Sequence, residues 1–264
     1  MLDGFLSHIG HGIRGPMSAI LGYAELLSTR LKDPTDQHYV NVIRNSGEQL
    51  VKFINDLIDI ARIDAGTFEL NRESVALTGL FEEINDLMLS RAQEKQLSFS
   101  VHFDRVVPKL IEADRRRLQQ ILVNLVSNAI RFTECGSVEL HARSDEARDI
   151  LEFEVTDTGV GITAEDRERL CETFAKSNPA SLWSGKGLGL IITSQLVRLM
   201  GGKISCRSEL GKGSCFRVTL PVTAIRAALH SKPETVNNRG EEPPSSGVAR
   251  ALNILLIDDN HGRN

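Results

Sequence analysis

Hydrophobic positions recur at helical spacing through residues 1–65, in two stretches separated by a short polar break at residues 32–36. This spacing is typical of coiled-coil and helix-bundle packing. Two amphipathic helices bury little apolar surface alone, so the pattern predicts a hairpin that forms a four-helix bundle as a homodimer. The apolar or small residues, alternately four and three apart, are Ile13, Met17, Ile20, Ala24, Leu27 and Leu31, then Val40, Ile43, Gly47, Leu50, Ile54, Leu57 and Ala61.

After residue 66 the pattern alternates between helical and strand periods. Helical spacing predicts helices over 78–95, 114–132 and 188–200. Alternation of apolar and polar residues predicts strands over 97–103, 137–142, 150–156, 203–208 and 214–220, with short strands around a turn in 67–77. We therefore expect an α+β chain in which the helical hairpin precedes a two-layer α/β sandwich.

These patterns predict four segments. Residues 1–66 form the helical dimerisation domain and residues 67–222 the sandwich domain. Residues 223–250 are polar and rich in proline, which indicates a flexible linker. Residues 251–264 contain a short apolar strand that ends in Asp258 and Asp259.

Composition excludes several classes of function. The formal net charge is −4 and aromatic residues make up 5% of the chain, so neither a basic nor a stacking surface for nucleic acid is expected. No stretch approaches the roughly 18 apolar residues of a membrane span, and no secretory signal begins the chain. We expect a cytoplasmic chain, which is compatible with a full-length parent that is anchored in a membrane. The four cysteines are scattered, which argues against a disulfide framework or a cysteine metal site.

A histidine on the first helix is the first candidate for chemistry. His11 lies off the apolar stripe, so its side chain is expected to face solvent. A lone helical histidine is more often an ordinary surface residue, but here helix-weakening residues surround it. Pro16 costs a helix interior about 3 kcal/mol, and Gly12 and Gly15 up to about 1 kcal/mol each. This local weakness suggests a functional bend beside a nucleophile.

Four later motifs complete the candidate chemistry. Asn124 and Asn128 are four residues apart and share one helix face, where amide oxygens can hold Mg²⁺. A turn with the pattern Asp-x-Gly-x-Gly follows a predicted strand at Asp157, Gly159 and Gly161. A second glycine turn opens a helix, whose backbone amides can receive phosphate. It runs through Gly185, Gly187, Leu188 and Gly189, and a last glycine turn ends at Ser214.

Residues 5–17 resemble the phosphoacceptor segment of sensor histidine kinases, with matches at Phe5, Leu6, His11, Ile13, Arg14 and Pro16. Residues 114–133 are similar to the N box of that family, and the glycine turns are similar to its nucleotide-binding turns. The resemblance covers roughly residues 1–221. It implies a dimerisation and phosphotransfer domain followed by a Bergerat-type ATP-binding domain.

The family roles carry over onto matching positions. The resemblance makes His11 the phosphoacceptor, with Arg14 and Pro16 beside it. It gives ATP and Mg²⁺ as cofactors, Asn124 as the metal-holding residue with Asn128 on the same face, and Arg131 as the cation that neutralises phosphate. It assigns adenine selection to Asp157. Further nucleotide contacts fall on Gly159, Gly161, Gly185, Gly187, Leu188, Gly189 and Ser214, and Phe174 matches the Phe box of a lid.

Two positions depart from the family pattern. The acidic residue that usually follows the histidine, as its proton acceptor or orienter, is Gly12 here, and the Thr or Asn that often precedes the proline is Gly15. Loss of a positioned base typically costs 10²- to 10⁴-fold in rate. The leading hypothesis is autophosphorylation on histidine and relay to a receiver aspartate. The alternative is a catalytically weak or silent module that binds ATP, dimerises and scaffolds a partner kinase.

A third, weaker hypothesis is an ATPase of the same superfamily without histidine chemistry, against which Arg14 and Pro16 argue. The expected partners are a second copy of the chain and the receiver domain of a response regulator or of a longer hybrid chain. Residues 254–260 are similar to the first strand and acidic pair of a receiver, so 251–264 is expected to be a truncated receiver start.

Overall fold

The computed structural model describes residues 2–104, 107–145, 149–175, 188–221, 223–224 and 255–256. The chain divides into two compact units. The first comprises residues 1–70 and 169–199, and the second comprises residues 71–168 and 200–264. None of the described helices is long and apolar enough to cross a membrane.

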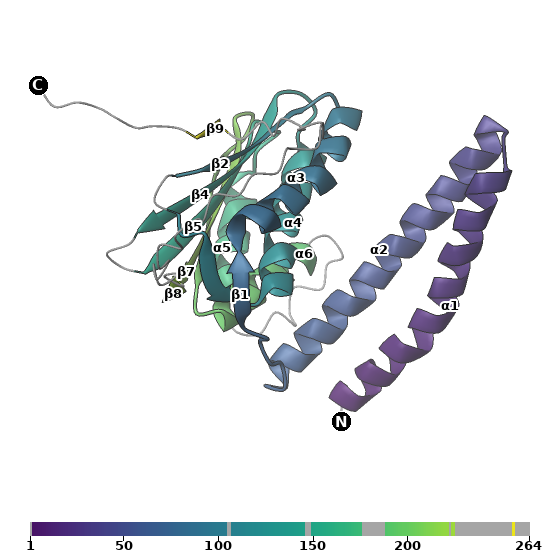
Figure 1. Cartoon of the computed structure of the whole chain (residues 1–264), viewed down its shortest axis with the longest axis horizontal. Coiled ribbons are helices and arrows are strands. Elements are labelled where there is room, and N and C mark those ends of the chain that lie inside the picture. Colours follow the sequence, from purple (N-terminus) through teal and green to yellow (C-terminus); the bar gives the residue numbers. More distant parts are fainter. Residues whose placement is uncertain are drawn as a thin grey trace, which may run out of the picture. The chain divides into compact units, whose positions relative to one another are not determined.

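The first unit is built on an antiparallel hairpin of two long helices, α1 (Leu2–Arg30) and α2 (Pro34–Asp64) (Figure 1). Asp33 is the N-cap of α2, and its carboxylate accepts hydrogen bonds from the backbone amides of Thr35 and Asp36. Pro34 follows at the first helical position, where a missing N–H is tolerated. The polar break predicted between the helices is therefore a stop followed by a new cap.

The hairpin buries only part of the predicted apolar seam. Met17, Ala24, Val40 and Gly47 are buried between the helices. At Gly47 the helices approach so closely that an added Cβ would lie 2.9 Å from Leu21 Cδ2. The alternating members of the seam, Ile20, Leu27, Ile43 and Leu50, are 45–49% exposed. A single chain therefore leaves an apolar stripe uncovered along the hairpin.

The second unit contains a six-stranded sheet in the order β6-β7-β5-β4-β2-β9. Its strands are β2 (Ser98–Phe103), β4 (Ser137–Asp145), β5 (Ile150–Asp157), β6 (Lys203–Glu209), β7 (Gly213–Pro221) and β9 (Leu255–Leu256). The pairs are antiparallel except for β2, which runs parallel to β4 and to β9. A second sheet of three strands, β1 (Glu73–Ala76), β3 (Leu110–Ala113) and β8 (Thr223–Ala224), has the order β1-β3-β8.

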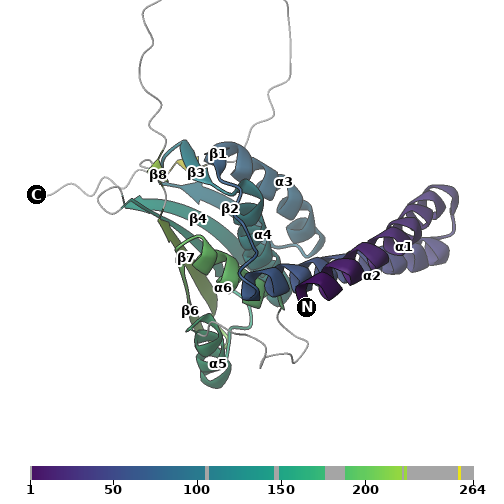
Figure 2. The ribbon, with the colours of Figure 1, turned by 90° about the horizontal axis from the view of Figure 1, so that it is seen from below.

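Two helices of this unit, α3 (Leu77–Glu94) and α4 (Arg115–Phe132), cover one face of the six-stranded sheet (Figures 1 and 2). The Phe81 ring on α3 contacts the rings of Phe103 and Phe153, at centroid distances of 4.5 and 5.8 Å. The fully buried residues of α4 are Leu118, Ile121, Leu122, Leu125 and Val126. This core fixes which face of α4 is turned toward the sheet and which remains for polar chemistry.

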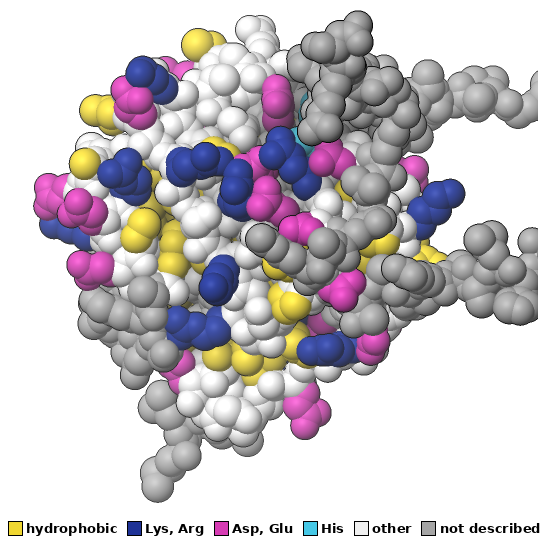
Figure 3. Space-filling view, turned by 90° about the vertical axis from the view of Figure 1, so that its left-hand side faces the viewer, with side chains coloured by type: hydrophobic (Ala, Val, Ile, Leu, Met, Phe, Trp, Pro, Cys, Tyr) yellow, Lys and Arg dark blue, Asp and Glu magenta, His cyan; other side chains and the backbone are white. Residues whose placement is uncertain are grey.

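The opposite face of the sheet carries mixed charges, and Figure 3 shows basic and acidic side chains gathered on the strand side of the molecule. At its centre Glu154 accepts hydrogen bonds from Arg217, and Arg143 and Arg207 each lie 3.4 Å from it. Burial raises the pKa of Glu154, but the hydrogen bonds and charge of Arg217 and the charge of Arg143 lower it more, so the net direction is downward. Glu154 is therefore held ionised.

The predicted mixture of a helical hairpin and an α/β sandwich is confirmed, while some elements differ from expectation. Only β1 forms within 67–77, where a pair of strands was expected. The strand β3 and the helix α5 (Ala164–Ala175) were not predicted. The predicted linker and receiver start contribute β8 and β9 but otherwise lie outside the described residues.

Candidate functional site

Helix α4 presents the three predicted polar groups at its C-terminal half. Its start is fixed by Asp114, which is 6% exposed and whose carboxylate accepts from the amides of Arg117 (3.0 Å) and Asn71 (2.9 Å). Asn124 is 2% exposed, whereas Asn128, one turn later, is only half-buried. Arg131 is exposed in the last turn. Both amides fit a hard cation, but the more accessible one belongs to Asn128.

The carboxylate of Asp157, at the end of β5, is held by one of its two oxygens. Oδ1 accepts hydrogen bonds from the backbone amides of Gly159 (2.9 Å) and Ser214 (3.2 Å). Within the described chain, the hydrogen bonds of this carboxylate all go to Oδ1, which leaves Oδ2 for a ligand. Burial raises the pKa of Asp157, and the two backbone hydrogen bonds oppose that rise.

The glycines around Asp157 leave no space for a side chain. A Cβ on Gly159 would collide with the carbonyl oxygen of Phe132, the last residue of α4. A Cβ on Gly161, which has φ +68°, would collide with the carbonyl oxygen of Glu209. A Cβ on Gly213, which has φ +96°, would collide with the carbonyl oxygen of Asp157. These glycines therefore let three backbone segments approach one another, and the φ values at two of them are ones that favour glycine.

Hydrogen bonds join the same three segments. The amide of Val160 donates to the carbonyl of Phe132 (3.2 Å), and the carbonyl of Val160 accepts from the amide of Gly211 (2.8 Å). The Asp157 turn (residues 157–162) is thus tied to the end of α4 on one side and to the β6–β7 turn on the other. The structure brings the predicted residues Asp157, Gly159, Gly161 and Ser214 together with the C-terminal end of α4.

Two hydroxyl residues that the sequence did not single out support this frame. Ser208 Oγ accepts from the amide of Ile162 (2.8 Å) and donates to the carbonyl of Gly213 (2.9 Å), so it bridges both turns. Thr158 Oγ1 accepts from the amide of Ser137 at 3.0 Å, which joins the Asp157 turn to the start of β4. Their signal in the sequence is weak because serine and threonine are common next to glycine turns.

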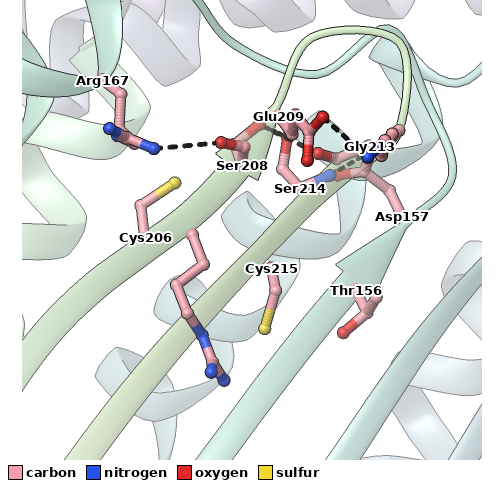
Figure 4. Close-up of a pocket in the computed structure, with 11 residues that line it drawn as sticks. Thr156, Asp157, Arg167, Cys206, Ser208, Glu209, Gly213, Ser214 and Cys215 are labelled. Atoms are coloured by element: carbon pink, nitrogen blue, oxygen red, sulfur yellow. Dashed lines mark hydrogen bonds and ion pairs between the residues drawn. The ribbon is translucent and has the colours of Figure 1, made fainter. Parts of the chain in front are cut away.

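A cavity of about 620 Å³ adjoins Asp157 on the side of β6 and β7 (Figure 4). Arg167 enters it and donates to the carbonyl of Ser208 at 3.3 Å. Asp157 and Ser214 reach its wall, but α4 does not contribute to it. The cavity is therefore separate from the predicted phosphate contacts on α4 and shares only Asp157 and Ser214 with the predicted nucleotide site. It is lined by Thr156, Asp157, Arg167, Cys206, Arg207, Ser208, Glu209, Lys212, Gly213, Ser214 and Cys215.

Other predicted nucleotide contacts belong to the first unit or lie outside the described residues. Phe174 is in the last turns of α5, where the guanidinium of Arg198 donates to its carbonyl at 3.3 Å. Leu188 begins α6 (Leu188–Leu199), followed by Gly189, and both are half-buried. Gly185 and Gly187 lie outside the described residues.

The predicted phosphoacceptor segment lies within α1. His11 is helical, and Pro16 lies inside the same continuous helix. Arg14, one turn after His11, donates to Asn55 Oδ1 of α2 at 3.2 Å, so it links the two helices near the histidine. Among the described residues of a single chain, a Cβ on Gly12 or Gly15 would meet nothing within 4 Å. Packing within this part of the chain therefore does not require glycine at either position.

Comparison with known protein families matches both parts of the chain. Residues 1–66 match the His Kinase A (phospho-acceptor) domain. Residues 113–224 match the family described as histidine kinase-, DNA gyrase B-, and HSP90-like ATPase. The chain thus contains the core of a sensor histidine kinase of two-component signal transduction and belongs to that family.

Curated relatives agree with this assignment. The autoinducer 2 sensor kinase/phosphatase LuxQ of Vibrio vulnificus is 34% identical over 97% of this chain and 30% of its own length. The hybrid signal transduction histidine kinase B of Dictyostelium discoideum is 32% identical over 86% of this chain and 12% of its own. The aerobic respiration control sensor protein ArcB of Escherichia coli is 31% identical over 97% of this chain and 32% of its own length. The chain spans about a third or less of each of these relatives.

Solved structures also match. Full-length ShkA in complex with AMPPNP is 35% identical, with a TM-score of 0.68 over 84% of this chain and 46% of that one. The histidine kinase AdeS of Acinetobacter baumannii, at 20% identity and a TM-score of 0.55, shares the fold over 80% of this chain and 96% of its own.

Proposed function

We propose that the chain transfers the γ-phosphoryl group of ATP to His11 and passes it to an aspartate of a receiver domain. Residues 1–66 act as the dimerisation and phosphotransfer domain, and residues 67–222 act as the ATP-binding domain. The observation that carries this proposal is the Asp157 carboxylate, which is buried and held by Oδ1 between two backbone amides. Its Oδ2 can accept a hydrogen bond from the amino group of adenine.

The polar residues of α4 supply the phosphate end of the proposed site. Asn128 and Asn124 share one face of α4, and Arg131 follows in the last turn. Amide oxygens on this face would hold Mg²⁺, which would neutralise the phosphates and orient them for transfer. The metal role assigned to Asn124 stays a prediction. The greater exposure of Asn128 supports that residue as the amide that reaches the ion, with Asn124 as its buried neighbour.

On the acceptor side, a ring nitrogen of His11 would attack the γ-phosphorus while ADP leaves, and the ring would lose a proton. No carboxylate follows His11 in sequence to take or orient that proton, because residue 12 is glycine. Solvent can accept the proton, at a lower rate than a positioned carboxylate. We therefore expect slow autophosphorylation. The scaffold alternative predicts nucleotide binding with no phosphohistidine.

The proposed homodimer follows from the uncovered stripe on the hairpin. Ile20, Leu27, Ile43 and Leu50 belong to the predicted seam and are 45–49% exposed in a single chain. A second copy that contributes the same stripe would cover it in a four-helix bundle. The similarity to hybrid histidine kinases supports a receiver as the next acceptor of the phosphoryl group.

The direct test is incubation of the purified chain with γ-labelled ATP and Mg²⁺. We expect label that is stable in base and labile in acid, as phosphohistidine is, and we expect the His11→Gln variant to lose it. His8→Gln, which removes the other histidine of the same helix, is the matched control and should keep the label. Label that survives in His11→Gln would contradict the assignment of the acceptor. ATP binding without any label would support the scaffold alternative.

A further inference from the structure

Lys95 contacts the C-terminal end of α4 from a distant part of the sequence. It is the C-cap residue of α3, more than 30 positions before its partners. Its ammonium donates to the carbonyl oxygens of Ile130 (2.9 Å), Arg131 (2.9 Å) and Thr133 (3.1 Å). An ammonium has three N–H donors, so one lysine side chain uses its full hydrogen-bonding capacity on this helix end.

These contacts complete the hydrogen bonding of the α4 terminus. The last carbonyls of a helix have no partner within it. Here the carbonyl of Ala129 accepts from the amide and hydroxyl of Thr133, and that of Phe132 accepts from Val160 in the Asp157 turn. Lys95 takes the carbonyls that remain, those of Ile130 and Arg131. A cation at this position also interacts favourably with the negative end of the helix dipole.

The body of α4 and its last turn depend on different contacts. Leu118, Ile121 and Leu122 are fully buried and anchor the body in the core. In the last turn Arg131 and Phe132 are both exposed, and the Arg131 guanidinium lies 5.5 Å from the centre of the Phe132 ring. Ala129 and Ile130, each 5% exposed, keep the start of the last turn packed. Without Lys95, the carbonyls of Ile130 and Arg131 would lose the ammonium as their partner, which would loosen the exposed end of that turn.

We propose that Lys95 is a positioning residue for phosphate binding, because it fixes the last turn of α4, which carries Arg131, follows Asn128 and is bonded to the Asp157 turn through Phe132. This inference rests on the proposed function, in which α4 faces the phosphates and Asp157 reads adenine. It assigns Lys95 no contact with the nucleotide. Its loss should therefore weaken the binding of phosphate and metal more than the binding of the base.

The test compares two ligands on four proteins: the parent chain, Lys95→Met, Lys95→Gln and Lys203→Met. The ligands are ADP with Mg²⁺ and adenosine alone, with dissociation constants from titration. Lys203 is exposed at the start of β6, in the same unit and away from α4, so Lys203→Met is the matched loss of one charge. Thermal unfolding by circular dichroism reports the stability of each variant.

For Lys95→Met we expect the dissociation constant of ADP with Mg²⁺ to rise about 10-fold, since the competent arrangement of the last turn becomes a minor population. The dissociation constant of Lys95→Met for adenosine should differ from that of the parent by less than about twofold. Lys95→Gln, whose amide keeps two of the donors, should fall between Lys95→Met and the parent. Lys203→Met should bind both ligands as the parent does.

Equal weakening of both ligands, or unchanged affinity with a lower melting temperature, would overturn the inference and leave Lys95 as a structural cap alone. If Lys95→Met does not fold, Lys95→Gln provides the same comparison, and unfolding of both would also overturn it. A parent chain that binds neither ligand would instead contradict the proposed function. These outcomes separate failure of the inference from failure of the function on which it rests.

Discussion

Glycines near the candidate nucleotide site and glycines near the candidate phosphoacceptor lie in opposite environments. Gly159, Gly161 and Gly213 are enclosed by backbone, and any side chain there would collide with a carbonyl group. Gly12 and Gly15, on either side of Ile13 and Arg14 in α1, have no described atom within 4 Å of an added Cβ. The same residue type therefore meets a packing requirement in one region and none in the other.

This contrast bears on the missing carboxylate after His11. Glycine in an exposed helix position costs up to about 1 kcal/mol relative to alanine. Within a single chain α1 offers space at Gly12, and no packing contact there requires glycine. We therefore expect that Gly12→Glu restores the family's carboxylate beside the histidine without disturbing the fold.

The largest expected effect comes from the glycines of the β6–β7 turn. Gly213→Ala should lower the free energy of unfolding by about 2–4 kcal/mol, because a positive φ and a backbone collision act together. Gly211→Ala is the control, since Gly211 has φ +79° but nothing within 4 Å of an added Cβ, and it should cost about 1 kcal/mol. Denaturant unfolding measures both. Equal losses in the two variants would show that the close approach of the two turns contributes nothing to the free energy of unfolding.

The uncovered stripe on the hairpin predicts the next effect. Ile20→Glu should weaken dimerisation at least about 100-fold, because it replaces a buried apolar contact with a charge in both copies. Ser18→Glu adds the same charge to α1 away from the apolar stripe and should leave the dimer intact. Sedimentation over a range of concentrations measures the association. A parent chain that stays monomeric at high concentration would contradict the proposed dimer.

Asp157→Asn is expected to weaken the binding of ADP without weakening the fold. The Asn oxygen can keep both backbone hydrogen bonds, but its amide nitrogen would face the adenine amino group donor to donor. We expect the dissociation constant for ADP to rise roughly 10- to 100-fold, the size of a lost hydrogen bond to a charged group. Titration with ADP measures it, and unchanged affinity would exclude Asp157 as the adenine contact.

Asp157→Asn should also stabilise the chain at neutral pH. Because burial raises the pKa of Asp157, the stability linked to its protonated form is present below the unfolded value of 3.8 and is lost as pH rises through the folded pKa. The melting temperature of Asp157→Asn should thus exceed that of the parent at pH 7, and the difference should close in acid. A lower melting temperature at pH 7 would contradict this.

The smallest effect is expected at Glu154 on the opposite face of the sheet. Its pKa is lowered, so its contribution is present above the unfolded value of 4.5 and lost as pH falls through the folded pKa. Glu154→Gln should cost about 1 kcal/mol at pH 7, as for a hydrogen-bonded but partly solvated charge, and nothing in acid. Unfolding curves at both pH values test this. A loss that persists in acid would point to packing as its cause.

Long periodic segments were predictable from the sequence, and short or polar ones were not. The structure places α4 at Arg115–Phe132, one residue from the predicted start, because its apolar face is continuous and Asp114 caps it. The strand β3 has only four residues, too few for alternation to identify it. The helix α5 begins Ala164, Glu165, Asp166, Arg167, Glu168, Arg169, which shows no apolar face.

The site was predictable where its residues form local motifs. The turn at Asp157 is recognisable by the spacing of its glycines. The sequence could not show that Gly161 packs against the β6–β7 turn and that Gly213 packs against the Asp157 turn. Lys95 was missed because its partners are backbone carbonyls more than 30 positions away, and no local pattern records such a contact. The burial difference between Asn124 and Asn128 likewise depends on the core beneath α4.

The measurement that tests this account most directly is the initial rate of phosphohistidine formation in Gly12→Glu relative to the parent, with nucleotide affinity and helical content measured in parallel. We expect unchanged affinity and helicity and a rate that rises at least about 10-fold, since positioned bases contribute 10²- to 10⁴-fold. The contradicting result is an unchanged or lower rate, with His11→Gln unlabelled in the same assay. It would show that the missing carboxylate at position 12 does not limit phosphoryl transfer to His11.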